Sequence, residues 1–89
     1  MNKREEREKI NFALGKAIRR RREVLGLYQI TVAEHVGLTK QGYSAIERAG
    51  VWISVAYLTQ IAEALKTSVT SLIFEAEVLN ESNGEKVDG

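Results

Sequence analysis

The sequence predicts a compact all-α domain of five helices. Apolar residues recur at spacings of three and four along most of the 89 residues, which is the period of one face of a helix. Proline is absent, and β-branched residues never alternate with polar ones over the length of a strand. Hydrophobic residues make up 44% and charged residues 28% of the chain, a balance typical of a folded globular domain.

The first two helices are expected over residues 5–25 and 29–36. Gly26 follows the first and Gly37 the second, and glycine accepts the left-handed backbone conformation that ends many helices. The apolar stripe of the first helix consists of Ile10, Leu14, Ala17, Ile18 and Leu25, and that of the second consists of Val32, Ala33 and Val36.

Three further helices are expected over residues 40–48, from just after Ser54 to about 65, and from 69 to about 77. Each begins after a residue whose hydroxyl can accept a hydrogen bond from a free amide of the first turn. These N-cap residues are Thr39, Ser54 and Ser68. From Asn80 onward the chain is polar and without periodicity, so we expect one domain over residues 1–79 and a mobile tail over residues 80–89.

The composition argues against several classes of protein. There is no cysteine, so disulfides and thiolate metal sites are excluded, and a reducing cytoplasm is compatible with this. No apolar stretch approaches the roughly 20 residues that cross a bilayer. With one histidine, His35, no phosphate-binding glycine loop and no clustered carboxylates, we expect neither an enzyme nor a cofactor. The sequence therefore favours a cytoplasmic, non-membrane binding protein.

Charge is distributed unevenly along the chain. Residues 1–50 hold 11 Lys/Arg and 6 Asp/Glu, a balance of +5, whereas residues 51–89 hold 2 and 6, a balance of −4. A domain with a basic half orients that half toward a polyanion.

The most informative stretch is residues 29–48, where a three-residue turn built on Gly37 separates two short amphipathic helices. On a helical wheel, one side of the second helix carries Tyr43 and Ile46. The other side carries groups that hydrogen-bond base edges and phosphates in a major groove. They lie within about 140° of arc at 100° per residue and comprise Lys40, Gln41, Ser44 and Arg48, with Ala45 beside them.

Over about residues 14–73 the chain resembles the lambda-repressor-like helix-turn-helix family, the Xre/Cro type that includes phage repressors and restriction-modification controller proteins. The segments that carry the resemblance are LGKAIRRRREVLGLYQ, VAEHVGLTKQGYSAIER and LTQIAEALKTSVTSLI. The chain departs from the family pattern at four positions. Tyr28 stands where a capping Ser or Thr is usual, and Ile53 where proline is common. Ala49 and Lys66 stand where the family has glycine. Gly42, inside the recognition helix, either lets the DNA backbone approach closely or is merely tolerated.

The resemblance implies a role for each site residue. The base-reading residues would be Lys40, Gln41, Ser44 and Ala45, with Gln41 suited to a bidentate contact with adenine. The resemblance assigns phosphate contacts to Gln29 and Arg48, and we expect Thr39 and, from the basic run 19–22, Arg19 to contact phosphates as well. Arg22 and Glu47 match a pair that forms a buried salt bridge between the first and third helices of the family. The other arginines of the run 19–22 point in different directions, and Arg19 is expected to pair with Glu23.

An apolar segment, Val51 to Ile53, stands between the third and fourth helices, where exposure needs a reason. We expect a twofold interface formed by Trp52, Ile53, Leu72, Phe74 and Val78, with Leu79 beside them. The alternative is that Trp52 folds back onto its own core.

The resemblance implies a transcriptional regulator that binds a double-stranded DNA operator as a homodimer, with two recognition helices about 34 Å apart. Occupancy would block or recruit RNA polymerase. A second function stays open: an interaction module, such as an antitoxin or anti-repressor, that uses the same scaffold to hold a protein partner. The apolar segment 51–53 and the acidic C-terminal half favour that alternative.

Overall fold

The computed structural model describes residues 2–49 and 53–88. These residues form five helices joined by short connections, which confirms the predicted all-α class. The helices are α1 (Lys3–Val24), α2 (Gln29–Val36), α3 (Lys40–Ala49), α4 (Val55–Ala64) and α5 (Val69–Asp88). No helix of the described residues is both long enough and apolar enough to cross a membrane.

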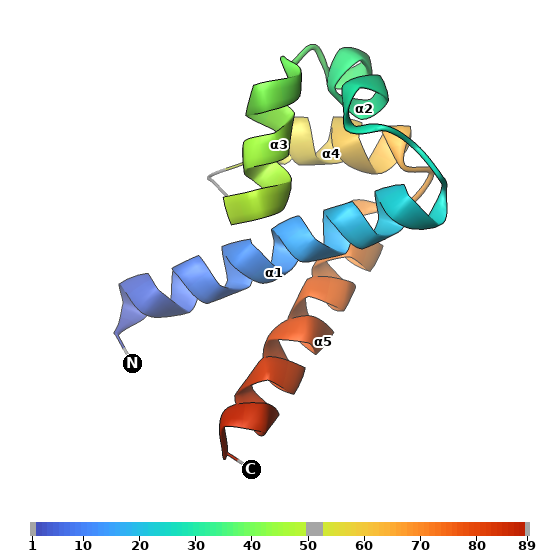
Figure 1. Ribbon diagram of the computed structural model, residues 1–89. Helices are drawn as coiled ribbons and strands as arrows, with labels where there is room; N and C mark the ends of the chain where they lie inside the picture. The colour runs from blue at the N-terminus through green and yellow to red at the C-terminus, as the bar shows by residue number, and fades with distance from the viewer. Residues whose placement is uncertain (1, 50–52, 89) are drawn as a thin grey trace.

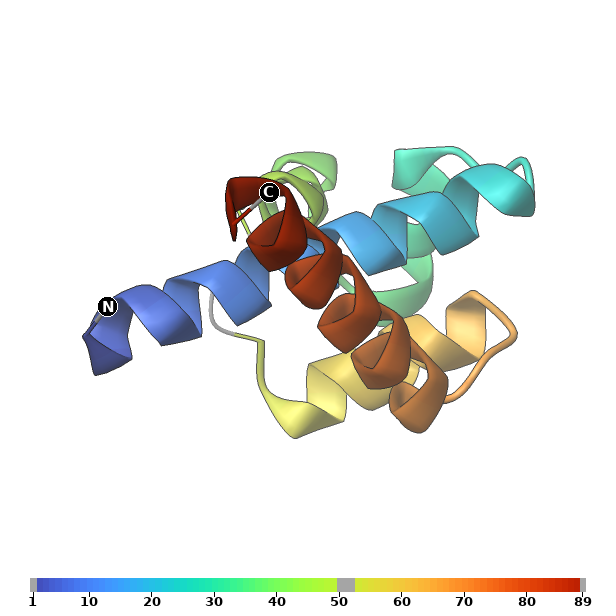
Figure 2. The ribbon, with the colours of Figure 1, turned by 90° about the horizontal axis from the view of Figure 1, so that it is seen from below.

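Helix α1 organises the molecule. In Figure 1 it runs across the middle, with α2, α3 and α4 on one side and α5 on the other. It packs most extensively against α5 and then against α3, while α2 contacts both α3 and α4. Figure 2 shows α5 crossing α1 in the view from below. The turn between α2 and α3 lies at the end of the molecule away from both chain ends, and α3 runs from this turn down to α1 (Figure 1).

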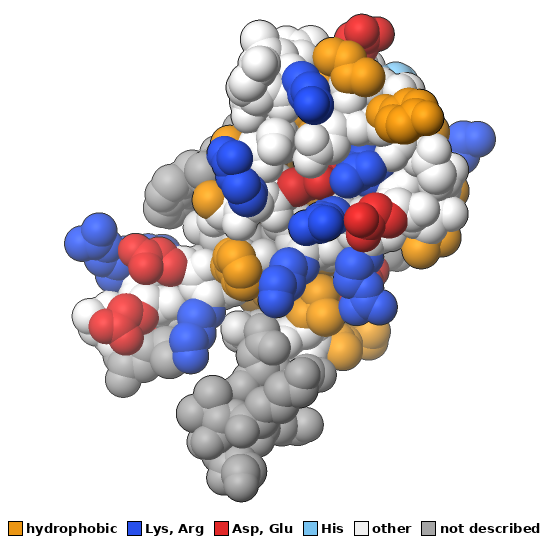
Figure 3. Space-filling model, in the orientation of Figure 1, with side chains coloured by type: hydrophobic (Ala, Val, Ile, Leu, Met, Phe, Trp, Pro, Cys, Tyr) orange, Lys and Arg blue, Asp and Glu red, His pale blue; other side chains and the backbone are white. Residues whose placement is uncertain are grey.

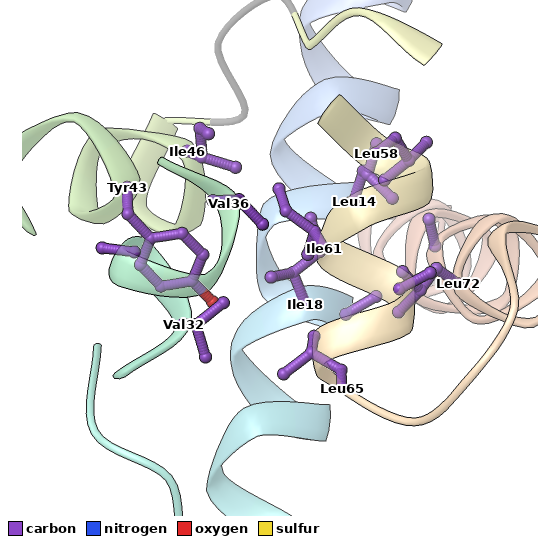
Figure 4. Close-up of a cluster of buried hydrophobic side chains, with 14 of the residues drawn as sticks. Leu14, Ile18, Val32, Val36, Tyr43, Ile46, Leu58, Ile61, Leu65 and Leu72 are labelled. Atoms are coloured by element: carbon purple, nitrogen blue, oxygen red, sulfur yellow. The ribbon is translucent and has the colours of Figure 1, made fainter. Parts of the chain in front are cut away.

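The core is built from side chains of every helix. Figure 4 shows them gathered in the space between the helices. The largest of the fully buried side chains are Tyr43, Ile18, Ile61, Leu65, Leu72 and Val32. Because α1 contributes Ala13 and Ala17 as well as Ile18 to this cluster, the neighbouring helices approach it closely.

Local signals set most of the helix ends. Gly26 and Gly37 have φ values of +70° and +74°, the left-handed conformation that their positions predicted. The Thr39 hydroxyl accepts a hydrogen bond from the Gly42 amide at 3.1 Å. The Ser54 hydroxyl accepts a hydrogen bond from the Tyr57 amide at 3.1 Å. The Ser68 hydroxyl accepts one from the Ser71 amide at 3.0 Å. All three predicted caps are therefore confirmed.

Helix α5 is longer than the sequence predicted. It was expected to end near Glu77, and it continues to Asp88. Leu79 is half-buried against the core cluster, so tertiary packing supports the helix beyond Glu77, and no proline interrupts the residues that follow. The domain boundary expected between residues 79 and 80 does not coincide with a helix end. The mobility expected of residues 80–89 stays a prediction.

Candidate nucleic-acid interface

Helix α3 has one face in the core and one face at the surface. Tyr43, Ile46 and Glu47 are buried. Lys40 and Gln41 are exposed, and the half-buried Ser44 and Ala45 follow them along the outward side. The helix is therefore held by its apolar face, and none of the described chain covers its polar face.

The outward side chains of α3 and the start of α2 line a shallow depression of about 220 Å³. Its lining residues are Gln29, Lys40, Gln41, Ser44 and Arg48. The structure thus brings together three of the four predicted base-reading residues and two of the predicted phosphate contacts. Ala45 is not among the lining residues, and Thr39 is exposed where it caps α3.

A second depression of about 230 Å³ continues this surface toward α1. Arg19 and Arg22 of α1 line it together with Ser44 and Arg48 of α3. Figure 3 shows Lys and Arg side chains distributed over this face of the molecule. The predicted phosphate contact Arg19 therefore lies on the same surface as the recognition helix.

The expected salt bridge between Arg22 and Glu47 is present and bidentate. Arg22 Nε donates to Glu47 Oε2 at 2.7 Å, and Arg22 Nη2 donates to Glu47 Oε1 at 3.1 Å. The two side chains are 12% and 2% exposed. Arg22 Nη1 also donates to the Leu27 carbonyl at 2.7 Å. This arrangement attaches α3 to α1 and to the connection before α2.

Gln29 has a second role that the sequence did not reveal. Its Nε2 donates a hydrogen bond to Glu47 Oε1 at 3.0 Å. A glutamine amide has two N–H groups and a carbonyl oxygen, so further capacity remains for a phosphate. Gln29 therefore belongs to the network that holds α3 as well as to the outward surface.

The hydrogen bonds and charges of this network favour the ionised forms of Arg22 and Glu47. Burial alone would raise the pKa of Glu47, but its interactions with Arg22, with the nearby Tyr43 hydroxyl and with Gln29 outweigh burial and hold the pKa below its ordinary value of 4.5. The hydrogen bond to Glu47 likewise raises the pKa of Arg22. The pair is therefore fully ionised at neutral pH.

Tyr43 lies beside this pair with its ring completely buried. Its hydroxyl oxygen is buried and has no hydrogen-bond partner among the described residues. Burial raises the pKa of Tyr43, and the nearby Glu47 carboxylate raises it further. The sequence predicted only an apolar contact here, so the buried hydroxyl is a feature that periodicity could not reveal.

The four arginines of residues 19–22 have four different partners, as their positions on one helix predicted. Arg19 Nε lies 3.4 Å from Glu23 Oε2, the predicted pair, and Arg20 Nε lies 3.7 Å from Glu75 Oε1 on α5. Arg21 donates to the main-chain carbonyls of Leu65 and Lys66, each at 2.9 Å, and so caps the end of α4. Lys66 itself has a φ of +54°, the conformation for which the family uses glycine.

Gly15 is a positioning residue that the sequence did not single out. A Cβ atom on Gly15 would lie 2.6 Å from the Ile46 carbonyl oxygen and 2.8 Å from the Glu47 carbonyl oxygen. Helix α1 therefore crosses the backbone of α3 at a distance that only glycine permits. A glycine inside an otherwise regular apolar stripe is the signal that could have found it.

The expected dimer interface needs one correction. Leu72 is 1% exposed and packs in the core of its own chain, so it does not lie on a surface available to a partner. Phe74 and Val78 are 65% and 44% exposed on α5, and Ile53 is half-buried against the core. The expectation for Trp52 lies outside the described residues.

Comparisons with known proteins agree with this geometry. The helix-turn-helix family model (HTH_3) matches residues 18–72. A crystal structure of the clp gene regulator ClgR from Corynebacterium glutamicum is similar with a TM-score of 0.86 and 26% identity, over 89% of this chain and 84% of that chain. A second ClgR structure is similar with a TM-score of 0.73 and 29% identity, over 76% and 88%. No curated protein matches the chain in sequence. The chain belongs to the Xre/Cro-type helix-turn-helix family of non-enzymatic, DNA-binding transcription regulators.

Proposed function

We propose that this chain binds a specific double-stranded DNA operator as a homodimer and regulates transcription from it. The observation that carries the proposal is the uncovered polar face of α3, whose opposite face is fixed in the core by Tyr43 and Ile46. A helix mounted in this way can enter a major groove without rearranging the domain.

Within the groove, each outward residue of α3 has its own chemistry. The Gln41 amide is suited to a bidentate contact with adenine, and Lys40 to guanine or a phosphate. The Ser44 hydroxyl can donate or accept, and the Ala45 methyl group can contact the methyl group of thymine. Gln41 is exposed and lines the depression together with Lys40 and Ser44, so we assign it the main part in base reading.

Phosphate contacts would flank these residues on both sides. Arg48 and Arg19 supply cationic groups at the end of the surface next to α1. Gln29 supplies an amide at the start of α2, and the Thr39 hydroxyl retains its own proton for donation while accepting from Gly42. The exposed pair between Arg19 and Glu23 contributes little to stability, so Arg19 can turn toward a phosphate at small cost.

The dimer would form through the apolar residues at the surface of α5. Phe74 and Val78 lie one helical turn apart and are both exposed, and they flank a groove that Arg20 and Glu75 also line. Ile53 lies two residues before the first residue of α4. A twofold arrangement would present two α3 helices about 34 Å apart, so each would read one half-site.

The likeness to ClgR, which is described as a clp gene regulator, supports a role in transcription. Operator occupancy would act by blocking or recruiting RNA polymerase.

Selection of bound duplexes from random DNA tests the proposal. The expected product is an inverted repeat whose half-sites are separated by about one helical turn, 10–10.5 base pairs, with affinity that falls steeply as salt rises. If no sequence is enriched and the chain instead holds a protein partner without affinity for DNA, the proposal is wrong and the interaction module replaces it.

A further inference from the structure

A lysine on α1 is held by an aromatic ring next to the proposed DNA surface. Lys16 Nζ lies 4.8 Å from the centre of the Phe12 ring. Both side chains are exposed, and Phe12 is 44% exposed. A ring beneath an ammonium group attracts it electrostatically and restricts where it can go.

The position of Lys16 follows from its neighbours along α1. Phe12 and Arg48 line one groove of about 630 Å³, and Arg19 and Arg48 line the depression next to it. Residues 12, 16 and 19 lie within about 60° of arc at 100° per residue, so they share one face of the helix. Lys16 itself lines neither depression, but along the helix it stands between Phe12 and Arg19, which both share a depression with Arg48 of α3. We call Phe12, Lys16 and Arg19 the α1 ridge.

Lys16 differs from Arg19 and Arg22 of the same helix in having no carboxylate partner among the described side chains. Arg22 is neutralised by Glu47, and Arg19 is paired with Glu23. Within residues 2–49 and 53–81, no carboxylate lies within the 4.0 Å of an ion pair with Lys16. Glu5, Glu8 and Lys9 line the groove on the N-terminal side of Phe12. Lys9 also has no ion pair among the described side chains, so what distinguishes Lys16 is the Phe12 ring beneath its ammonium group. Among the described side chains, Lys16 is thus the one cation of the ridge that has no ion pair and is held by an aromatic ring.

We propose that Lys16 contacts a DNA phosphate outside the helix-turn-helix segment 29–48, with Phe12 as its positioning residue. The inference rests on the proposed function and deepens it, because it extends the contact surface from α3 along α1. A phosphate contact of this kind adds affinity without reading sequence. It also predicts a specific dependence on salt, since each neutralised phosphate releases counterions.

The test measures DNA binding at several salt concentrations for the wild-type chain and for Lys16→Gln. The substitution removes one phosphate contact from each subunit of the proposed dimer, so it is expected to reduce the slope of log K against log salt concentration by about 1.8. It should weaken binding to operator and random duplexes by the same factor. Lys3→Gln is the matched control, because Lys3 lies on the same helix but pairs with Glu6 at 3.8 Å. It should leave the slope unchanged.

Phe12→Leu tests the positioning role separately. It keeps the Lys16 charge and removes the ring, so the slope should stay as in the wild-type chain while affinity falls about two- to fivefold. Wild-type affinity in Phe12→Leu would overturn the positioning role. A wild-type slope in Lys16→Gln, with the wild-type chain binding DNA, would overturn the Lys16 contact alone. A wild-type chain without any DNA binding would overturn the proposed function and this inference together.

Discussion

Arg22 Nε lies 2.7 Å from Glu47 Oε2, and this contact joins the helix that organises the core to the helix that faces outward. The carboxylate also accepts from Gln29 at the start of α2. One buried glutamate therefore ties together α1, α2 and α3. The outward face of α3 is oriented by a polar network as well as by apolar packing.

Arg22→Met should destabilise the fold by about 3–5 kcal/mol, because it leaves the Glu47 charge buried without its cationic partner. Urea denaturation followed by circular dichroism measures this loss. Arg4→Met is the matched control, since Arg4 pairs with Glu8 at an exposed site where such pairs contribute little. Equal effects of the two substitutions would contradict a structural role for the buried pair.

Stability should fall in acid partly through Glu47. A carboxyl whose pKa is lower in the folded than in the unfolded chain stabilises the fold fully above the unfolded value, and this stabilisation is lost as pH falls through the folded value. For Glu47 the loss begins as pH drops below the ordinary value of 4.5. The wild-type chain should therefore lose more unfolding free energy between about pH 6 and pH 3 than Glu47→Gln does. If the unfolding free energies of the two proteins fall in parallel with pH, Glu47 does not contribute to the loss of stability in acid.

Gly15→Ala should destabilise the fold even though alanine favours helix. The added Cβ would meet two backbone carbonyl oxygens of α3, which cannot move aside as a flexible side chain would. Overpacking costs about 1–3 kcal/mol or more, which exceeds the gain in helix propensity of about 1 kcal/mol. The thermal unfolding midpoint should fall.

Gly42→Ala is the matched control for Gly15→Ala. Gly42 is exposed, and the nearest atom to its Cβ would be the Thr39 hydroxyl oxygen at 3.2 Å, the end of a side chain. The midpoint of this variant should not fall. Its DNA affinity then decides between the two interpretations of Gly42, because a loss indicates close approach of the DNA and no loss indicates tolerance.

Tyr43→Phe should leave the fold equally stable or make it slightly more stable. The substitution removes a buried hydroxyl that has no hydrogen-bond partner among the described residues, and so removes a desolvation cost without breaking a hydrogen bond. Urea denaturation of the two proteins checks this. A loss above about 1 kcal/mol, the value of a typical hydrogen bond, would indicate that the hydroxyl is bonded in solution.

The helices and their ends were predictable because their signals are local. Gly26, Gly37 and the hydroxyls of Thr39, Ser54 and Ser68 act within one helical turn. The pairing of Arg22 with Glu47 came from the family resemblance, since no local rule connects two residues 25 positions apart.

What escaped prediction depends on the tertiary arrangement. The close crossing at Gly15 requires α3 to lie against α1, and the Arg21 cap requires the end of α4 to lie beside α1. Leu72 was assigned to a dimer surface because periodicity cannot tell which apolar residues of α5 face the core. For the same reason periodicity did not predict that Leu79 packs against the core and stabilises α5 beyond its expected end.

Gln41→Ala tests the central claim, that the outward face of α3 reads DNA sequence. Gln60→Ala is the matched control, because Gln60 is an exposed glutamine on α4. Binding to the selected operator should weaken by about 1–3 kcal/mol for each half-site in Gln41→Ala, with preference lost at one position of each half-site and little change on random DNA. Equal losses on operator and random DNA, or no loss on either, would contradict the claim.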